Sequence, residues 1–94
     1  MKKDEARKAI EKMGLPVPQE KAARRTIARA TRLEDIEITR HASGDLVIIR
    51  TRPGNFGKQV FEDTIKPDGS KVVIPKAYDP SGQLVHFDPK GGIP

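Results

Sequence analysis

The sequence contains no cysteine and no tryptophan, and its aromatic side chains are three phenylalanines and one tyrosine among 94 residues. The lack of cysteine excludes disulfide bonds and thiolate chemistry, which suits a reducing compartment or a chain that unfolds to cross a membrane. The scarcity of aromatic residues argues against a nucleic-acid surface built from a row of stacked rings.

Long apolar runs and several well-known motifs are also missing, which excludes several functional classes. Each run is far shorter than the roughly 20 residues of a membrane-spanning helix, and the N-terminal stretch MKKDEARKAIEKMG has no apolar core of a secretory signal. Neither a GxxxxGKS/T nor a GxGxxG motif is present, which excludes phosphate-binding loops of those kinds. The two histidines lack the close spacing of zinc ligands, so we expect neither a metal nor a cofactor.

Positive charge is what the chain has in excess. Eighteen lysines and arginines against thirteen acidic residues give a net charge of +5 and an isoelectric point near 9.7. A field of this sign attracts polyanions, and nucleic acid is therefore the first partner to consider.

The N-terminal part predicts a short helix followed by a linker. Apolar positions recur there at helical spacing, and they are Ala6, Ile10 and Met13. Asp4 is the expected N-cap, and Gly14 follows the last turn. Two prolines within residues 15–18 predict an extended connector. We expect residues 1–18 to form this helix and linker, and residues 19–94 to form the main domain.

A second helix is predicted over about residues 19–33, with two distinct faces. Its apolar face consists of Ala23, Ile27 and Ala30, and its basic face consists of Arg25, Arg29 and Arg32. The basic face matches a surface that follows a phosphate backbone. It is equally typical of a solvated outer face.

After residue 34 the pattern becomes strand-like. Five short runs follow, at residues 36–42, 45–52, 58–65, 71–78 and 83–87. Among their connectors are Pro67-Asp68-Gly69 and Pro80-Ser81-Gly82, turns that join antiparallel neighbours, and a third such triplet, Pro89-Lys90-Gly91, follows the last run. The expected fold is α+β, with one or two N-terminal helices on one face of a four- to five-stranded antiparallel sheet.

Because side chains alternate along a strand, an inner and an outer set are expected. The inner set is predicted to be Ile36, Ile38, Val47, Ile49, Phe61, Ile65, Val72, Ile74, Val85 and Phe87. The outer set, on a sheet face that no second layer covers, is predicted to be Glu37, Thr39, His41, Arg50, Arg52, Glu62, Thr64, Lys71 and His86.

The outer set suggests metal-independent RNA cleavage, in which the 2′-hydroxyl attacks the phosphate and no protein nucleophile is needed. Glu62 is the expected base, His86 the expected acid, and His41 a reserve for either role. Arg50 and Arg52 would hold the phosphate. Further RNA contacts are expected from Lys71, Thr64, Arg25, Arg29 and Arg32. The alternative for Glu62 is an ordinary cross-strand ion pair.

A resemblance supports this hypothesis. The stretch YDPSGQLVHFDPKG, residues 78–91, is similar to the tail of ribonuclease toxin domains of bacterial competition systems, especially the ribosome-cleaving colicins. The order of helices and strands also resembles the wider group that contains barnase. This resemblance implies delivery as the C-terminal part of a larger secreted protein, action in the cytoplasm of the target cell, and an acidic immunity protein as partner of an otherwise monomeric domain. The Asp, His and Glu cluster of those colicins is missing, which leaves tRNA or other RNA open as the target beside rRNA.

Two alternatives come from other functional classes. One is a noncatalytic RNA- or ribosome-binding module that uses the arginine face of the second helix together with the sheet. The other is a small immunity or antitoxin protein, although a basic chain is poorly suited to neutralising a basic nuclease.

Overall fold

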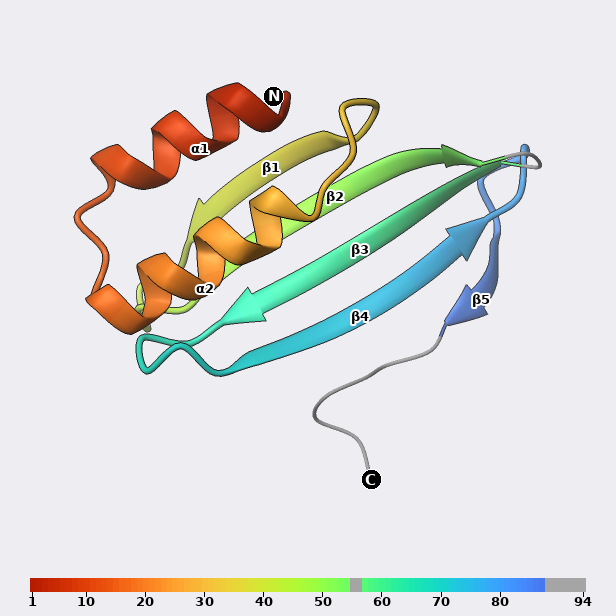
Figure 1. Cartoon of the computed structure of the whole chain (residues 1–94). Coiled ribbons are helices and arrows are strands. Elements are labelled where there is room, and N and C mark those ends of the chain that lie inside the picture. Colours follow the sequence, from red (N-terminus) through yellow and green to blue (C-terminus); the bar gives the residue numbers. More distant parts are fainter. Residues whose placement is uncertain (55–56, 88–94) are drawn as a thin grey trace.

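The computed structural model describes residues 1–54 and 57–87, with His86 and Phe87 described by their backbone alone. Two helices precede five strands (Figure 1). Their bounds are α1 Lys3–Lys12, α2 Val17–Ala28, β1 Asp35–Arg40, β2 Leu46–Gly54, β3 Gly57–Ile65, β4 Lys71–Tyr78 and β5 Leu84–Phe87. The predicted α+β fold is confirmed: the helices pack against a five-stranded antiparallel sheet.

Helix α1 is an integral part of the core. Its predicted apolar stripe is confirmed, because Ala6 and Ile10 are fully buried and Met13 packs against the same core cluster. The predicted cap is wrong: Lys2 occupies the N-cap position without a side-chain cap, and Asp4 lies inside the first turn. A carboxylate there still stabilises the helix, because it faces the positive end of the helix dipole.

Helix α2 begins earlier and ends earlier than predicted. It starts at Val17 with proline in the first turn, where a missing N–H costs no hydrogen bond. It ends at Ala28, and Lys3 Nζ donates to the carbonyls of Ala28 and Ala30 at 2.8 and 3.2 Å. Arg32 therefore lies beyond the helix, and the predicted row of three helical arginines is wrong.

The strands form a meander in the order β1-β2-β3-β4-β5, with every neighbouring pair antiparallel. Two of the predicted Pro-x-Gly turns join β3 to β4 and β4 to β5. Gly69 and Gly82 have φ values of 90° and 89°, a conformation that glycine adopts without strain. The third predicted triplet, residues 89–91, lies outside the described residues.

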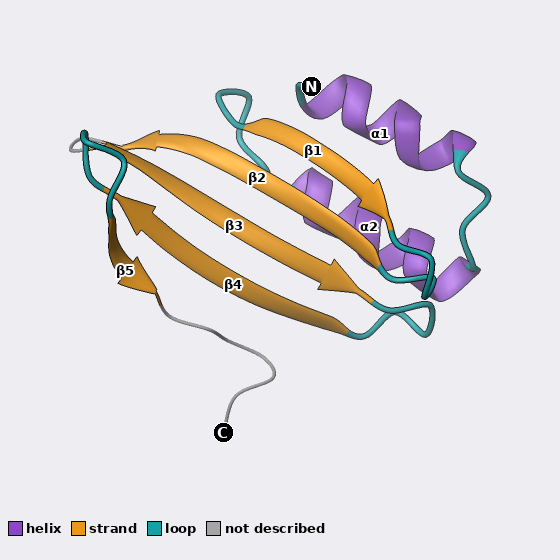
Figure 2. Cartoon of the chain, turned by 180° about the vertical axis from the view of Figure 1, so that it is seen from behind, coloured by secondary structure: helices purple, strands orange, loops and turns teal. Residues whose placement is uncertain are grey.

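Both helices lie on one face of the sheet, and the view from behind shows the other face uncovered by any described element (Figure 2). The core lies between the helices and strands β1 to β3. Small residues such as Ala22 and Ala23 let α2 lie close to the sheet. The far ends of β2, β3 and β4 extend beyond the helices (Figure 1).

The predicted division of side chains between the two sheet faces is partly wrong. In β2 the buried residues are Leu46 and Ile48, so Val47 and Ile49 point to the open face. The register then places the following residues on the helix side: Ile36 and Ile38, Arg50 and Arg52, Phe61, Asp63 and Ile65, and Lys71, Val73 and Pro75. The open face carries Val47, Ile49, Val60, Val72 and Ile74 among polar residues, and Val85, predicted to be inside, is 64% exposed.

Candidate nucleic-acid interface

A cationic surface forms on the helix side of the sheet, where side chains of α2 and of the start of β4 meet. We define the α2–β4 cationic surface as Arg25, Arg29 and Lys71. Arg25 lies in the last turn of α2, and Arg29 is its C-cap residue with helical backbone angles, so these two exposed side chains, four residues apart, lie on the same side of the helix end. No described residue pairs with either guanidinium in an ion pair.

Lys71 is the centre of this surface. Its Nζ donates to the hydroxyl of Thr26 at 3.1 Å, and Thr26 is itself buried and donates to the Ala22 carbonyl. Partial burial lowers the pKa of the Lys71 ammonium, and the charges of Arg29, Arg50 and Arg25 lower it further, whereas the carboxylate of Asp63 offsets part of this effect. An anion beside Lys71 would relieve this repulsion.

Two contacts hold α2 in place against the end of β3 and the β3–β4 turn. Gln19 is fully buried, and its Nε2 donates to the carbonyls of Gly44 and Ile65 at 2.9 Å each. The turn before β4 packs under the first turn of α2, since a Cβ on Gly69 would come within 2.9 Å of the Pro18 carbonyl oxygen. The backbone thereby brings the α2 arginines to Lys71.

Arg50 is committed to a buried ion-pair cluster. Its Nε lies 2.8 Å from Asp63 Oδ2 and its Nη1 lies 3.5 Å from Glu34 Oε1. Both carboxylates are fully buried, and the Arg50 side chain is only 12% exposed. Glu34 also accepts a hydrogen bond from the Thr31 amide. Arg50 therefore neutralises buried charge, which leaves its predicted role in holding a phosphate unsupported.

Arg52 lies two residues further along β2, on the same face as Arg50. The guanidinium carbons of Arg50 and Arg52 lie 4.8 and 5.0 Å from the centroid of the Phe61 ring. The Nε atom of Arg52 is buried and has no hydrogen-bond partner among the described residues. Arg52 and Phe61 are both partly exposed.

The predicted catalytic cluster does not assemble on one face. Glu62 and Thr64 point to the open face, whereas Arg50, Arg52 and Lys71 lie on the helix side. Glu62 Oε2 lies 3.4 Å from Lys76 Nζ, so the ordinary cross-strand ion pair is observed, with lysine in place of arginine. A base on one face of a sheet cannot serve a phosphate held on the other.

The histidines lie near opposite ends of the sheet. His41 is exposed in the β1–β2 turn, where its amide donates to the Asp45 carbonyl. The backbone of His86 pairs with Ala77, which belongs to the same end as Arg52. The His86 side chain lies outside the described residues, so its predicted role as the acid remains a prediction.

Arg32 belongs to a separate basic region. It lines a shallow cavity of about 460 Å³ together with Lys2, Lys3 and Asp4. Lys2 already pairs with Asp35 at 2.9 Å, and Lys3 caps α2. Arg32 therefore does not extend the α2–β4 cationic surface.

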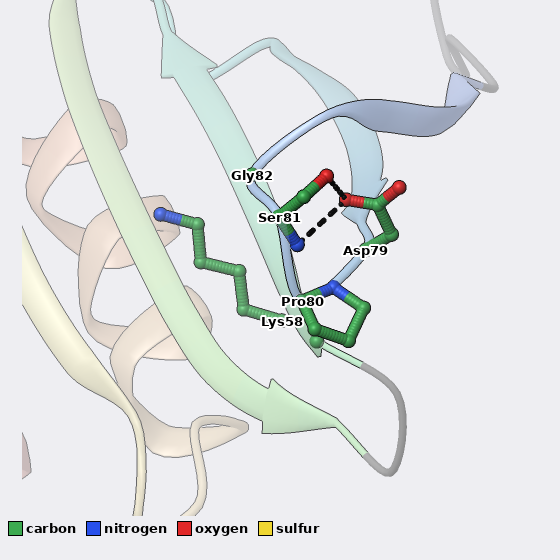
Figure 3. Close-up of a pocket in the computed structure, with 6 residues that line it drawn as sticks. Lys58, Asp79, Pro80, Ser81 and Gly82 are labelled. Atoms are coloured by element: carbon green, nitrogen blue, oxygen red, sulfur yellow. Dashed lines mark hydrogen bonds between the residues drawn. The ribbon is translucent and has the colours of Figure 1, made fainter.

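A second cavity, of about 350 Å³, lies at the β4–β5 turn (Figure 3). The carboxylate of Asp79 accepts hydrogen bonds from the hydroxyl and amide of Ser81 and from the amide of Gln83. The hydroxyl of Ser81 is the main cause of the lowered pKa of Asp79. These polar groups of the turn satisfy one another, and Lys58, which also lines the cavity, has its Nζ 5.4 Å from the centroid of the Tyr78 ring.

Within the described part of the chain, neither helix is both long and apolar enough to cross a bilayer. The same residues contain no group of three or more histidine and acidic side chains placed to hold a metal ion. No protein-family model, curated protein or solved structure matches the chain.

Proposed function

We propose that the protein binds RNA through the α2–β4 cationic surface. The observation that carries this proposal is the convergence of Lys71 with Arg25 and Arg29, whose guanidinium groups pair with no described carboxylate. Repulsion among these groups falls when a phosphate enters, which makes anion binding favourable. The surface combines a helix end with a strand, and both of its arginines are exposed, which suits a polymer backbone better than an enclosed small molecule.

The first test is the salt dependence of binding. Fluorescence anisotropy with single-stranded RNA should give an association constant that falls with salt, with a log–log slope of about 2 to 3 in magnitude for three phosphate contacts. Double-stranded RNA should show a comparable slope, because phosphate contacts carry no sequence information. Absence of binding at low salt, or binding that is insensitive to salt, would remove the proposal.

RNA cleavage is the second candidate, and it is favoured by the lowered pKa of Lys71. An ammonium whose pKa is lowered gives up its proton more easily than that of a solvated lysine, and a group of this kind can serve as a general acid. In the proposed step the 2′-oxygen bonds to phosphorus and the bond to the 5′-oxygen breaks. Lys71 protonates the 5′-oxygen, and the proton of the 2′-hydroxyl passes to water. This assigns the acid to Lys71 in place of His86.

The cleavage proposal predicts different outcomes for two Lys71 variants in EDTA with tRNA or rRNA. Lys71→Arg should retain RNA binding but lose roughly a hundredfold or more in cleavage rate, because a guanidinium does not give up its proton. Lys71→Met should lose the cleavage to a similar extent and should also weaken binding by one phosphate contact, which lowers the log–log salt slope by about 0.7 to 0.9. Intact RNA with the wild-type protein would leave binding as the only function, and unchanged cleavage by Lys71→Arg would exclude Lys71 as the acid.

The resemblance to ribonuclease toxins extends this proposal to partners and location. We place the protein as the C-terminal part of a delivered toxin that acts on tRNA or rRNA in the target cytoplasm. An acidic immunity protein would then cover the α2–β4 cationic surface, because opposite charge steers association and the covered surface is the one that RNA needs.

A further inference from the structure

The geometry points to a stacking site for an unpaired nucleobase on Arg52 and Phe61, which we call the Arg52–Phe61 platform. This inference rests on the proposed binding of RNA, and it deepens that proposal by naming single-stranded RNA as the preferred form. The α2–β4 cationic surface by itself would accept any polyanion.

The platform is formed by a guanidinium lying over an aromatic ring. The Arg52 guanidinium carbon lies 5.0 Å from the Phe61 centroid, a distance typical of cation–π contact. No described carboxylate pairs with Arg52, in contrast to Arg50, whose charge is held by Asp63 and Glu34. A planar guanidinium that is fixed on a ring presents its second face to a nucleobase.

The fold leaves this platform accessible from the helix side. Arg52 pairs with Gln59, next to the ends of β2 and β3 that extend beyond both helices (Figure 1). Arg52 and Phe61 both retain partial exposure. A base can therefore approach from the side of the sheet on which the cations lie.

A single RNA strand could reach both the Arg52–Phe61 platform and the α2–β4 cationic surface, because both lie on the helix side of the sheet. Lys71 and Ala77 are six residues apart on β4, and Ala77 belongs to the same cross-strand row as Gln59 and Arg52. Six residues of strand span about 20 Å, a length that a few nucleotides can cover. A single strand whose phosphates contact Lys71 can thus place a base on Arg52.

Stacking requires a planar group, whereas attraction to phosphate requires only a positive charge, so a substitution that keeps the charge can separate the two effects. Lysine keeps the positive charge of Arg52 but lacks the planar surface. Arg52→Lys should weaken binding of a short oligoadenylate by about fivefold or more, the lower end of the effect of one stacked base. Binding of an abasic oligomer with the same number of phosphates should change by less than about twofold.

The matched control is Arg7→Lys, the same substitution at an exposed position of α1, outside both the platform and the α2–β4 cationic surface. Its affinities for both oligomers should stay within about twofold of the wild type, because no proposed contact with RNA is changed. Circular dichroism of each variant verifies that the fold is retained.

The outcomes separate this inference from the proposed function. Equal affinities of Arg52→Lys and wild type for oligoadenylate, with wild-type binding intact, overturn the platform and leave RNA binding standing. Equal losses on the oligoadenylate and the abasic oligomer also overturn it, because Arg52 would then act by charge alone. If the wild-type protein binds neither oligomer, the proposed function fails and the platform fails with it.

Discussion

Replacing Arg50 by methionine is expected to lower the free energy of unfolding by about 3 to 5 kcal/mol, the range measured when one partner of a buried ion pair is removed. The variant leaves Asp63 and Glu34, both fully buried, without their cation. Asp63 Oδ1 and Glu34 Oε1 have no hydrogen-bond partner among the described residues. No other described group is therefore placed to compensate these two oxygens for the loss of the Arg50 charge. Urea denaturation followed by circular dichroism measures the change.

Arg52→Met is the matched control, because Arg52 lies on the same strand and face but pairs with no described carboxylate. Its loss should stay below about 1 kcal/mol. Adding Asp63→Asn to Arg50→Met should recover part of the loss, because one uncompensated charge is removed. If Arg50→Met does not fold, Arg50→Lys and this double variant still test the cluster. Equal stabilities of Arg50→Met and Arg52→Met would contradict a structural role for Arg50.

Much of the fold could be predicted because its signals are local. Turn residues and short apolar runs gave all five strands within a few residues of their observed bounds. The stripe of Ala6, Ile10 and Met13 gave the buried side of α1. The end of α2 could not be predicted, because it depends on Lys3, a residue distant in sequence that caps the last carbonyls.

The face of each strand was harder to predict than the strand itself. In β2 all four residues of the run Leu46-Val47-Ile48-Ile49 are apolar, at odd and at even positions alike. The alternation of side chains along a strand therefore could not indicate which of its two faces is buried. The run Val72-Val73-Ile74 in β4 has the same ambiguity. Choosing the wrong parity moved Arg50, Arg52 and Lys71 to the open face in the prediction, and the proposed catalytic cluster followed from that choice.

One overlooked signal could have corrected the assignment. Phe61 and Ile65 were correctly predicted to face the helices, and Asp63 lies between them with the same parity. A carboxylate on the buried face requires a cation nearby. That requirement would have assigned Arg50 to the face of β2 that packs against the helices. Leu46 and Ile48, which have the same parity, would then have been assigned to that face as well. Glu34 carried no such signal, because it lies between predicted elements.

Reversing the charge of Arg25 and Arg29 together is expected to abolish most of the RNA affinity. Each Arg→Glu change removes one phosphate contact and adds a repulsive carboxylate to the α2–β4 cationic surface. The loss of two contacts should reduce the log–log salt slope by about 1.5 to 2. At low salt the affinity should fall by at least about tenfold, while the fold is retained because both side chains are exposed.

The central claim is that RNA binds on the helix side of the sheet, at α2 and β4. Its most direct test compares Arg25→Glu/Arg29→Glu with Lys8→Glu/Lys12→Glu, which changes the net charge equally on exposed positions of α1. Anisotropy titrations with one single-stranded RNA at low salt should show the large loss only for the α2 variant. Equal losses for the two variants, or full affinity of the α2 variant, would contradict the claim.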